Sequence, residues 1–429
     1  MTETYLILAI AAIVLAVAAL LTRKREGYMP AVILLVALVA PFLAGQGFRP
    51  REVVEGAFAY LDVVLWMVMG GLLVALLYQN GTLEYLVDKC LRRNWSNRVK
   101  LVGLLFWIAI PGMLTGSAVA SAATTGVIAA TLLMRRGVPR AKAVEVAAAG
   151  SFLGMVLPPL CAPAMLMVVG RAGSYNPSFE GFFVPLLAIG LPALLIYGLL
   201  CGERLLGEMA HDTQEAPVGS MASAIPVIVV FLLVLAHNFL YMYLPFLGYP
   251  VIYLIGFILA AIFSPRRVNP LKAALDGPNT VLLPAALMFA AGGLNEVLWL
   301  TGVQGNLNTQ LVQAPEVWLF VIPVVAMFLL ARVFGQPFAW ALAALTPTLI
   351  NGAGYQLTPL RLLAAGTILA AASYRSFFGS STVPSTVNAQ LDGDTAMPTL
   401  PLVSCMPVMI VMVLSFVIAL VPGLDWLMI

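Results

Sequence analysis

The chain has 429 residues, of which 62% are hydrophobic and 10% are charged, and its mean hydropathy is +1.00. Soluble globular proteins carry about 25% charged residues, so this composition excludes a water-facing surface around the whole chain and predicts a polytopic α-helical membrane protein. The formal net charge of +3 gives no indication of nucleic-acid binding, and the four cysteines lack metal-ligand spacing.

Apolar segments recur along the chain at lengths that suit a bilayer core, which needs about 20 residues of helix. The predicted spans are 5–22, 29–44, 59–78, 182–201, 222–241, 244–263, 280–300 and 400–421. The first is expected to be a retained span and not a signal peptide, because Arg23, Lys24 and Arg25 follow it instead of preceding it. Residues 203–220 form the longest polar loop and are expected to join two halves.

Two further regions do not fit simple spans. Residues 111–159 begin and end with proline and are rich in Gly, Ala, Ser and Thr, and residues 317–388 are apolar but interrupted by Pro, Gly and polar residues. In hydrocarbon, backbone that leaves a helix is tolerated only where it is buried in protein or lines a polar cavity. We therefore expect two re-entrant hairpins, one at 111–135 and one near Gln336, and two discontinuous helices.

The two halves of the chain resemble each other in the order of their glycines. Gly70 and Gly71 precede a turn at Gly81, as Gly292 and Gly293 precede Gly302, at an offset of about 220 residues. An internal repeat of this size is typical of transporters. The alternative is that apolar helices resemble one another through composition alone.

The distribution of basic residues sets the expected orientation. With both hairpins re-entrant, most of the 22 Lys and Arg residues fall on one side, which we take as cytoplasmic, and the N-terminus lies outside. The first hairpin then opens from the cytoplasm and the second from the outside. The sequence thus predicts an all-α polytopic protein of the prokaryotic inner membrane, with an inverted structural repeat.

The most specific signal is a series of motifs in the first half. In order, they are GMLTGS at 112–117, ASAATTG at 120–126, RG at 136–137, AGSFLG at 149–154 and PP at 158–159. In order, spacing and residue type, they resemble the large membrane subunit of TRAP transporters, the DctM-like permeases of the ion transporter superfamily. The resemblance implies an elevator-type secondary transporter that uses a Na⁺ gradient, needs no other cofactor and usually moves organic acids. It also implies a small four-helix membrane subunit and a periplasmic substrate-binding protein as partners.

The same resemblance points to the residues of an ion and substrate site. Hairpin tips and helix breaks leave N–H and C=O groups without helical partners, and hydroxyls and carbonyls suit Na⁺. The expected site residues are Gly116, Ser117, Ser121, Thr124, Thr125, Gly150, Ser151, Gly154 and Pro158 in the first half, and Arg332, Gln336, Thr346, Pro347, Ser373, Arg375, Gly379, Ser380, Ser381, Thr382 and Ser385 in the second. Na⁺ is expected at Gly116, Ser117, Gly150, Ser151, Ser380 and Ser381. The alternative is that the small residues serve helix packing alone.

The second half departs from the family pattern. An expected Asp is absent near Gln336 and Pro337, and the segment 378–385 has one proline fewer. These departures leave open a carrier of the same superfamily that needs no binding protein, or an exporter, coupled to protons or to Na⁺. A membrane-embedded enzyme is not expected, because the sequence contains neither HExxH nor GxSxG and no paired intramembrane carboxylates.

Several charges lie in or beside apolar sequence. Arg375, with Arg332 as a second candidate, is expected to neutralise a substrate carboxylate; snorkelling to an interface is the alternative. A solvated interfacial arm is expected to carry Glu84, Asp88, Lys89, Arg92 and Arg93. Glu145 is expected to form a local ion pair.

These expectations divide the chain into scaffold and transport parts. The predicted parts are scaffold spans with a first arm at 1–99, the first hairpin and broken helix at 100–172, central scaffold spans at 173–278, a scaffold span with a second arm at 279–315, the second hairpin and broken helix at 316–390, and a C-terminal span at 391–429.

Overall fold

The chain is helical where the computed structural model describes it, and the described residues contain no strand. These residues are 2–21, 26–169, 179–207, 209, 219, 221–240, 243, 247–303, 305–306, 309, 316–334, 340, 359–372, 374, 382–392, 405–421 and 423–428. Within them, six helices are long and apolar enough to cross a membrane, and shorter apolar helices of 10–17 residues accompany them. The predicted all-α polytopic architecture is confirmed.

The described helices include one in each predicted span, together with shorter helices between the spans. The first half contains α1 (Thr2–Leu21), α2 (Met29–Leu43), α3 (Pro50–Phe58), α4 (Leu61–Gln79), α5 (Thr82–Arg92), α6 (Asn97–Thr115), α7 (Ala118–Ser121), the π-helical turn η2 (Ala122–Gly126), α8 (Val127–Arg135), α9 (Arg140–Val156), α10 (Ala162–Val169) and α11 (Phe183–Leu206). The second contains α12 (Ile225–Leu240), α13 (Tyr249–Ile262), α14 (Pro270–Asp276), η5 (Gly277–Thr280), α15 (Leu282–Leu300), α17 (Glu316–Phe334), α19 (Pro359–Ala372), α20 (Thr382–Asp392) and α21 (Met406–Leu420).

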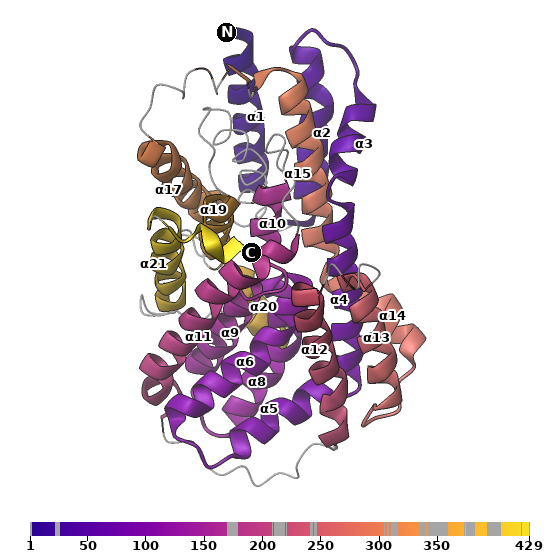
Figure 1. Ribbon diagram of the computed structural model, residues 1–429, viewed down its shortest axis with the longest axis vertical. Coiled ribbons are helices and arrows are strands. Elements are labelled where there is room, and N and C mark those ends of the chain that lie inside the picture. Colours follow the sequence, from indigo (N-terminus) through magenta and orange to yellow (C-terminus); the bar gives the residue numbers. More distant parts are fainter. Residues whose placement is uncertain are drawn as a thin grey trace.

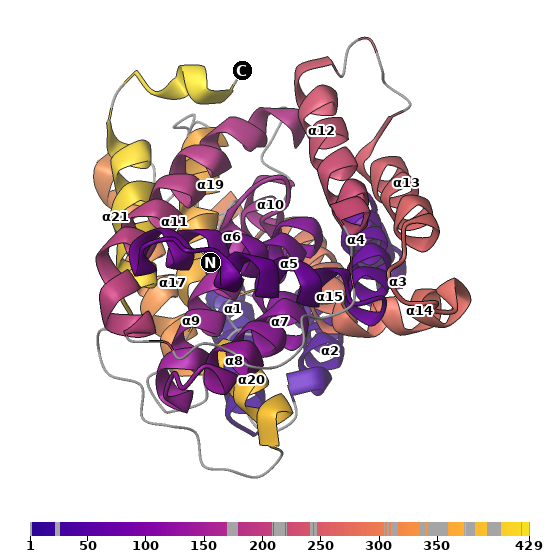
Figure 2. The same ribbon diagram turned by 90° about the horizontal axis from the view of Figure 1, so that it is seen from below.

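The helices pack in two groups, with α5 between them (Figure 1). In the α4 group, α2 and α3 pack on α15, and α13 and α14 pack on α4. In the α6 group, α6 packs on α9 and α11, α19 packs on α10 and α21, and α20 packs on α9. Figure 2 shows α12, α13 and α14 on one side of the molecule and α9, α11 and α21 on the other. The groups meet where α4 and α5 contact α6, and where α5 contacts α8.

Glycines allow the two halves to cross at backbone distance. A Cβ built on Gly56 of α3 would lie 2.5 Å from the Gly292 carbonyl oxygen of α15, and one built on Gly71 of α4 would lie 3.0 Å from the Gly277 carbonyl oxygen of η5. Helices approach this closely only where no side chain intervenes. The same interval of 221 residues separates Gly56 from Gly277, Gly71 from Gly292, and Gly81 from Gly302. Gly81 and Gly302 both have a positive φ. Each half thus supplies a short helix that crosses a long helix of the other half in a similar way.

The first hairpin differs from the prediction in where it begins and bends. Pro111 was expected to start it, but this proline lies inside α6, which begins at Asn97 and continues to Thr115. Proline removes one helical hydrogen bond, and packing and side-chain hydroxyls can compensate for that loss inside a membrane protein. Here the side of α6 around Pro111 is buried against α9, and a Cβ on Gly112 would lie 2.8 Å from the Gly154 carbonyl carbon. The bend therefore occurs at Gly116.

Candidate functional site

The tip of the first hairpin rests on the break of a discontinuous helix. The α6 helix ends at Gly116, whose φ of +64° is strained for any residue with a side chain. A Cβ there would lie 2.8 Å from Leu160 Cγ and 3.0 Å from the Ala162 nitrogen. Ser117 then caps α7, because its Oγ accepts a hydrogen bond of 3.3 Å from the Ala120 N–H. The positive φ and the missing side chain of Gly116 thus allow the tip to pack directly on the chain that follows α9.

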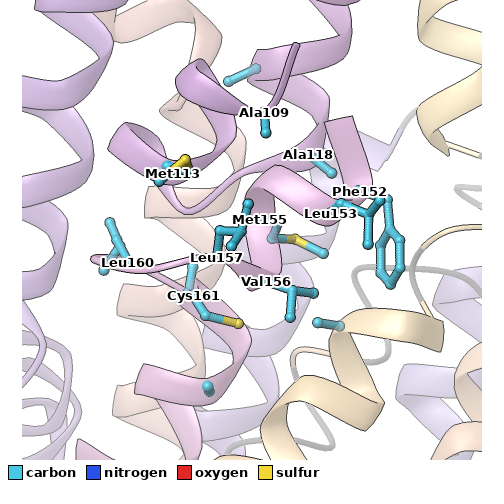
Figure 3. Close-up of a cluster of buried hydrophobic side chains, with 14 of the residues drawn as sticks. Ala109, Met113, Ala118, Phe152, Leu153, Met155, Val156, Leu157, Leu160 and Cys161 are labelled. Carbon is cyan, nitrogen blue, oxygen red and sulfur yellow. The ribbon is translucent and has the colours of Figure 1, made fainter. Parts of the chain in front are cut away.

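The break itself spans residues 157–161, between α9 and α10. The peptide bond between Pro158 and Pro159 is cis, and all the residues of the break are buried. Figure 3 shows Met113 of α6 in one apolar cluster with Leu160 and its neighbours in the break. The predicted discontinuous helix of the first half is therefore present, and the non-helical backbone of both the tip and the break lies inside the protein, as hydrocarbon requires.

Buried hydroxyls follow the tip along the returning arm. Ser121 Oγ donates a hydrogen bond of 2.5 Å to the Ile108 carbonyl, and Thr125 Oγ1 donates one of 3.5 Å to the same oxygen. Thr124 Oγ1 donates to the Ala120 carbonyl at 2.7 Å. Thr124 and Thr125 lie in the π-helical turn η2, and such turns occur frequently at functional sites. These hydroxyls are therefore held in fixed orientations by the backbone.

Ser151 on α9 adds a further hydroxyl to this region. It is fully buried, and its Oγ donates a hydrogen bond of 2.8 Å to the Ala147 carbonyl. A Cβ built on Gly126 would lie only 3.1 Å from this Oγ, which places α9 directly against η2. A hydroxyl that donates its proton to a carbonyl keeps its lone pairs available as acceptors. Lone pairs of this kind can ligate a hard cation such as Na⁺.

The second half reaches this region through α20. Val387 Cγ2 lies 3.6 Å from the position of a Cβ on Gly126, and α20 packs on η2, α8 and α9. The next residue of α20, Asn388, accepts hydrogen bonds of 3.0 and 2.7 Å at its Oδ1 from Arg140 at the start of α9. Ser385 lies on α20, half-buried. The structure thus brings the helix after the second predicted break onto the first hairpin.

Several predicted second-half residues lie outside the described part of the chain. They are Gln336, Thr346, Pro347, Ser373, Arg375, Gly379, Ser380 and Ser381, and for Thr382 the structure describes only its place at the start of α20. The second hairpin falls mostly in the same part. Arg332 is described and buried on α17, where its guanidinium carbon lies 5.4 Å from the Phe328 ring centroid. This is a cation–π contact along one helix.

A comparison with protein families matches residues 102–354 to the DctM component of the tripartite ATP-independent periplasmic transporters. The chain belongs to this family. The match covers most of the first hairpin, the broken helix of the first half, and η5 and α15 of the second half. This DctM component is therefore a multi-pass membrane protein and a secondary transporter, and its family indicates transport rather than catalysis. Since the family description is of a tripartite system, it also implies partner proteins.

Solved structures share the fold. The crystal structure of the Alcanivorax borkumensis YdaH transporter aligns with a TM-score of 0.66 at 17% identity, over 94% of this chain and 99% of that one. Neisseria gonorrhoeae MtrF, described with a class of antimetabolite efflux pumps, aligns with a TM-score of 0.58 at 13% identity, over 93% and 96% of the chains. A comparison with curated protein sequences finds no match. At these identities the likeness shows the fold alone.

Two predicted site glycines of the DctM component take part in helix packing. A Cβ on Gly150 would lie 2.8 Å from Ile108 Cβ, and one on Gly154 would overlap the Ala109 carbonyl oxygen. Both contacts join α9 to α6, which is the role that small residues commonly have between membrane helices. The structure therefore gives Gly150 and Gly154 a packing role, and it places their backbone beside the hairpin arm that carries Ser121 and Thr125.

The prediction of a solvated first arm is wrong for one of its residues. Asp88 is buried, with only 4% of its side chain exposed, whereas Arg92 and Arg93 remain exposed. The reason is that α5 packs on α8, so that Asp88 faces Arg136 just beyond that helix and the two form an ion pair of 2.8 Å. Nothing in the sequence pattern links positions so far apart, and this contact was missed for that reason.

Glu145 forms an ion pair, as expected, but with a distant partner. Its Oε1 lies 2.5 Å from Arg204 Nη2 and accepts a hydrogen bond of 3.5 Å from the Tyr197 hydroxyl. The carboxylate is 4% exposed, and both partners lie on α11. The pair therefore fastens α11 to α9 within the α6 group.

Proposed function

We propose that this DctM component is the carrier subunit of a Na⁺-driven uptake system for a small organic acid, and that it works by an elevator movement. The observation that supports the proposal most strongly is the seating of the Gly116 hairpin tip on the break at 157–161, with oriented hydroxyls beside it. Such a meeting of two interrupted segments supplies free backbone carbonyls and N–H groups at one place.

The proposed Na⁺ ligands in the first half are oxygens of uncharged groups. Ser117 and Ser151 supply hydroxyls, and the non-helical backbone near Gly116 supplies carbonyls, with Gly150 close behind on α9. Oxygen ligands suit a hard cation. The N-terminus of α10, which begins beside the hairpin tip, favours a substrate carboxylate. We propose that Ser380 and Ser381 complete the second ion site and that Arg375, with Arg332 as the second candidate, pairs with the substrate.

The proposed moving unit is the α6 group, and the α4 group is the fixed scaffold. This unit is larger than the sequence suggests, because α11 packs on α6 and α9, and α21 packs on α11 and α19. The Glu145 ion pair to Arg204 joins α11 to the same unit. The partners we propose are a small four-helix membrane subunit and a periplasmic substrate-binding protein. The N-terminus is proposed to lie outside the inner membrane.

Uptake in proteoliposomes tests the coupling. The purified protein is reconstituted with the two proposed partner proteins and supplied with radiolabelled mono- and dicarboxylic acids under an imposed inward Na⁺ gradient. We expect accumulation that disappears when K⁺ replaces Na⁺ and persists when a proton ionophore is added. Uptake that ignores the Na⁺ gradient and follows a pH gradient would contradict Na⁺ coupling.

A cysteine cross-link tests the elevator movement. A Cβ built on Gly103 of α6 lies 2.9 Å from the sulfur of the native Cys90 on α5, which is within reach of an S–S bond of about 2.05 Å. We expect Gly103→Cys, with the other cysteines replaced by alanine, to lose transport on oxidation and regain it on reduction. Because burial raises the pKa of the Cys90 thiol to about 11, a copper–phenanthroline catalyst is needed.

A second cysteine pair serves as the control for that cross-link. A Cβ on Gly71 lies 3.1 Å from Val281 Cγ2, and both positions belong to the α4 group. The double variant Gly71→Cys, Val281→Cys, in a background without other cysteines, is expected to transport equally in its oxidised and reduced forms. Full transport by the cross-linked Cys90–Gly103→Cys protein would show that α6 does not move against α5.

The second candidate is a carrier of the same superfamily that works without a binding protein, including an exporter. The alignment with MtrF over nearly the whole of both chains favours it, because MtrF is described with efflux pumps. Reconstituting the chain alone separates the two. Substrate movement without any partner protein supports the second candidate, and strict dependence on both partners supports the first.

A further inference from the structure

Two buried polar contacts connect the α4 group and α5 to the α6 group. The first is the ion pair of Asp88 on α5 with Arg136 beyond α8, at 2.8 Å. Their side chains are 4% and 5% exposed. Asp88 also contacts Arg92 at 2.6 Å, but that arginine is 36% exposed. The buried part of this cluster therefore lies between the arm and the hairpin.

Helix α5 is connected to the α4 group by the chain and by an ion pair. It follows α4 after a single turn at Gly81, and its Glu84 forms an ion pair of 2.9 Å with Arg266, which lies beyond α13. A Cβ on Gly81 would lie 3.2 Å from Arg266 Cζ, so the turn itself packs on the same arginine. We therefore assign α5 and its Asp88 to the α4 group, whereas Arg136 follows the hairpin of the α6 group.

The second contact lies toward the other end of the interface. The hydroxyl of Tyr60, between α3 and α4, donates a hydrogen bond of 2.9 Å to the Leu166 carbonyl of α10. Tyr60 and Leu166 are both buried, with 1% and 0% exposed. The Tyr60 ring packs on Gly292 of α15, so this residue is anchored in the α4 group. Figure 1 shows α10 and α5 well separated along the long axis of the molecule.

We propose that the Asp88–Arg136 ion pair and the Tyr60–Leu166 hydrogen bond are two latches that hold the carrier in this conformation. The inference rests on the proposed elevator movement. When two apolar surfaces slide, one set of contacts replaces another at small cost, but a buried charge or hydroxyl that loses its partner bears the full cost of desolvation. The two bonds therefore favour this conformation over any other position of the α6 group, and they set the ratio of conformations during transport.

Distance measurements between spin labels test the latches. Labels on Val54 of α3 and Leu200 of α11, which are 52% and 62% exposed, report on the two groups from positions outside the interface. The label pair is introduced into the full chain without other cysteines, in nanodiscs. We expect Tyr60→Phe to lower the ratio of this conformation to the alternative by about five-fold, and Asp88→Asn by at least ten-fold.

Two matched variants control for side effects. Arg92→Gln removes the exposed partner of Asp88 but leaves the buried ion pair, and Tyr253→Phe removes a buried hydroxyl within the α4 group. Both are expected to leave the ratio unchanged. If Asp88→Asn fails to fold, Tyr60→Phe still decides the question, because phenylalanine keeps the ring that packs on Gly292.

The outcomes distinguish the latch from the elevator. The spin labels could report a single distance under all Na⁺ and substrate conditions while the Cys90 cross-linked protein still transports. This result would overturn both the proposed elevator movement and the proposed latches. Two distances whose ratio is the same in wild type and in Tyr60→Phe overturn the latch and leave the elevator intact. A shift in Tyr60→Phe that the Tyr253→Phe control does not share supports both.

Discussion

Replacing Gly116 with alanine tests whether the hairpin tip depends on its close contact with the helix break. Two separate costs follow from the structure. The φ of +64° is left-handed, which costs a residue with a side chain about 1–2 kcal/mol. The new methyl group would also lie 2.8 Å from Leu160 Cγ and 3.0 Å from the Ala162 nitrogen, and overpacking of this kind costs about 1–3 kcal/mol. We expect a total of about 2–5 kcal/mol.

The chain offers a matched control for this substitution. Gly137 has a φ of +81°, but a Cβ on it would meet nothing within 4 Å. Gly137→Ala should therefore bear the backbone cost of about 1–2 kcal/mol without the packing cost. The difference between the two variants isolates the contact between the tip and the break.

Thermal unfolding in detergent, with and without Na⁺, is the assay. We expect Gly116→Ala to lower the melting temperature by about twice as much as Gly137→Ala, because the first bears both costs and the second bears one. We also expect it to abolish the stabilisation by Na⁺ that wild type and Gly137→Ala retain. Equal losses of melting temperature in the two variants, with Na⁺ stabilisation intact in both, would refute the reasoning that the tip is fitted to the break.

Three further substitutions probe other contacts. Gly70→Ala places a methyl group on the Leu114 carbonyl oxygen at the contact of α4 with α6, and we expect uptake to fall more than ten-fold at an unchanged protein level. Ser151→Ala removes one proposed Na⁺ ligand, and the Na⁺ concentration for half-maximal uptake should rise several-fold while the maximal rate is retained. Glu145→Gln weakens the ion pair with Arg204, which is 38% exposed, and thermal melts should show a loss of about 1–3 kcal/mol with transport per folded molecule preserved.

The backbone breaks of the first half were predictable because glycine and proline mark such breaks locally. Gly116 was expected within the first hairpin and lies at its bend, and Pro158 was expected in a discontinuous helix and lies in its break. Pro111 was expected to begin the hairpin, but the packing of α6 on α9 keeps it helical. A local signal cannot include that compensation, because the partner helix lies beyond the hairpin in sequence.

Composition and apolar length were enough to predict a helical membrane protein, and the order of the motifs indicated a transporter family. Low charge, apolar length and the spacing of small residues are local properties, and hydrocarbon allows few structures that satisfy them. Which residues meet depended on the packing of the helices. It turned the hydroxyl of Ser121 toward the Ile108 carbonyl, and it buried Asp88 against Arg136. Such contacts depend on how separate segments pack, and elsewhere in the fold glycine surfaces let the helices approach to backbone distance.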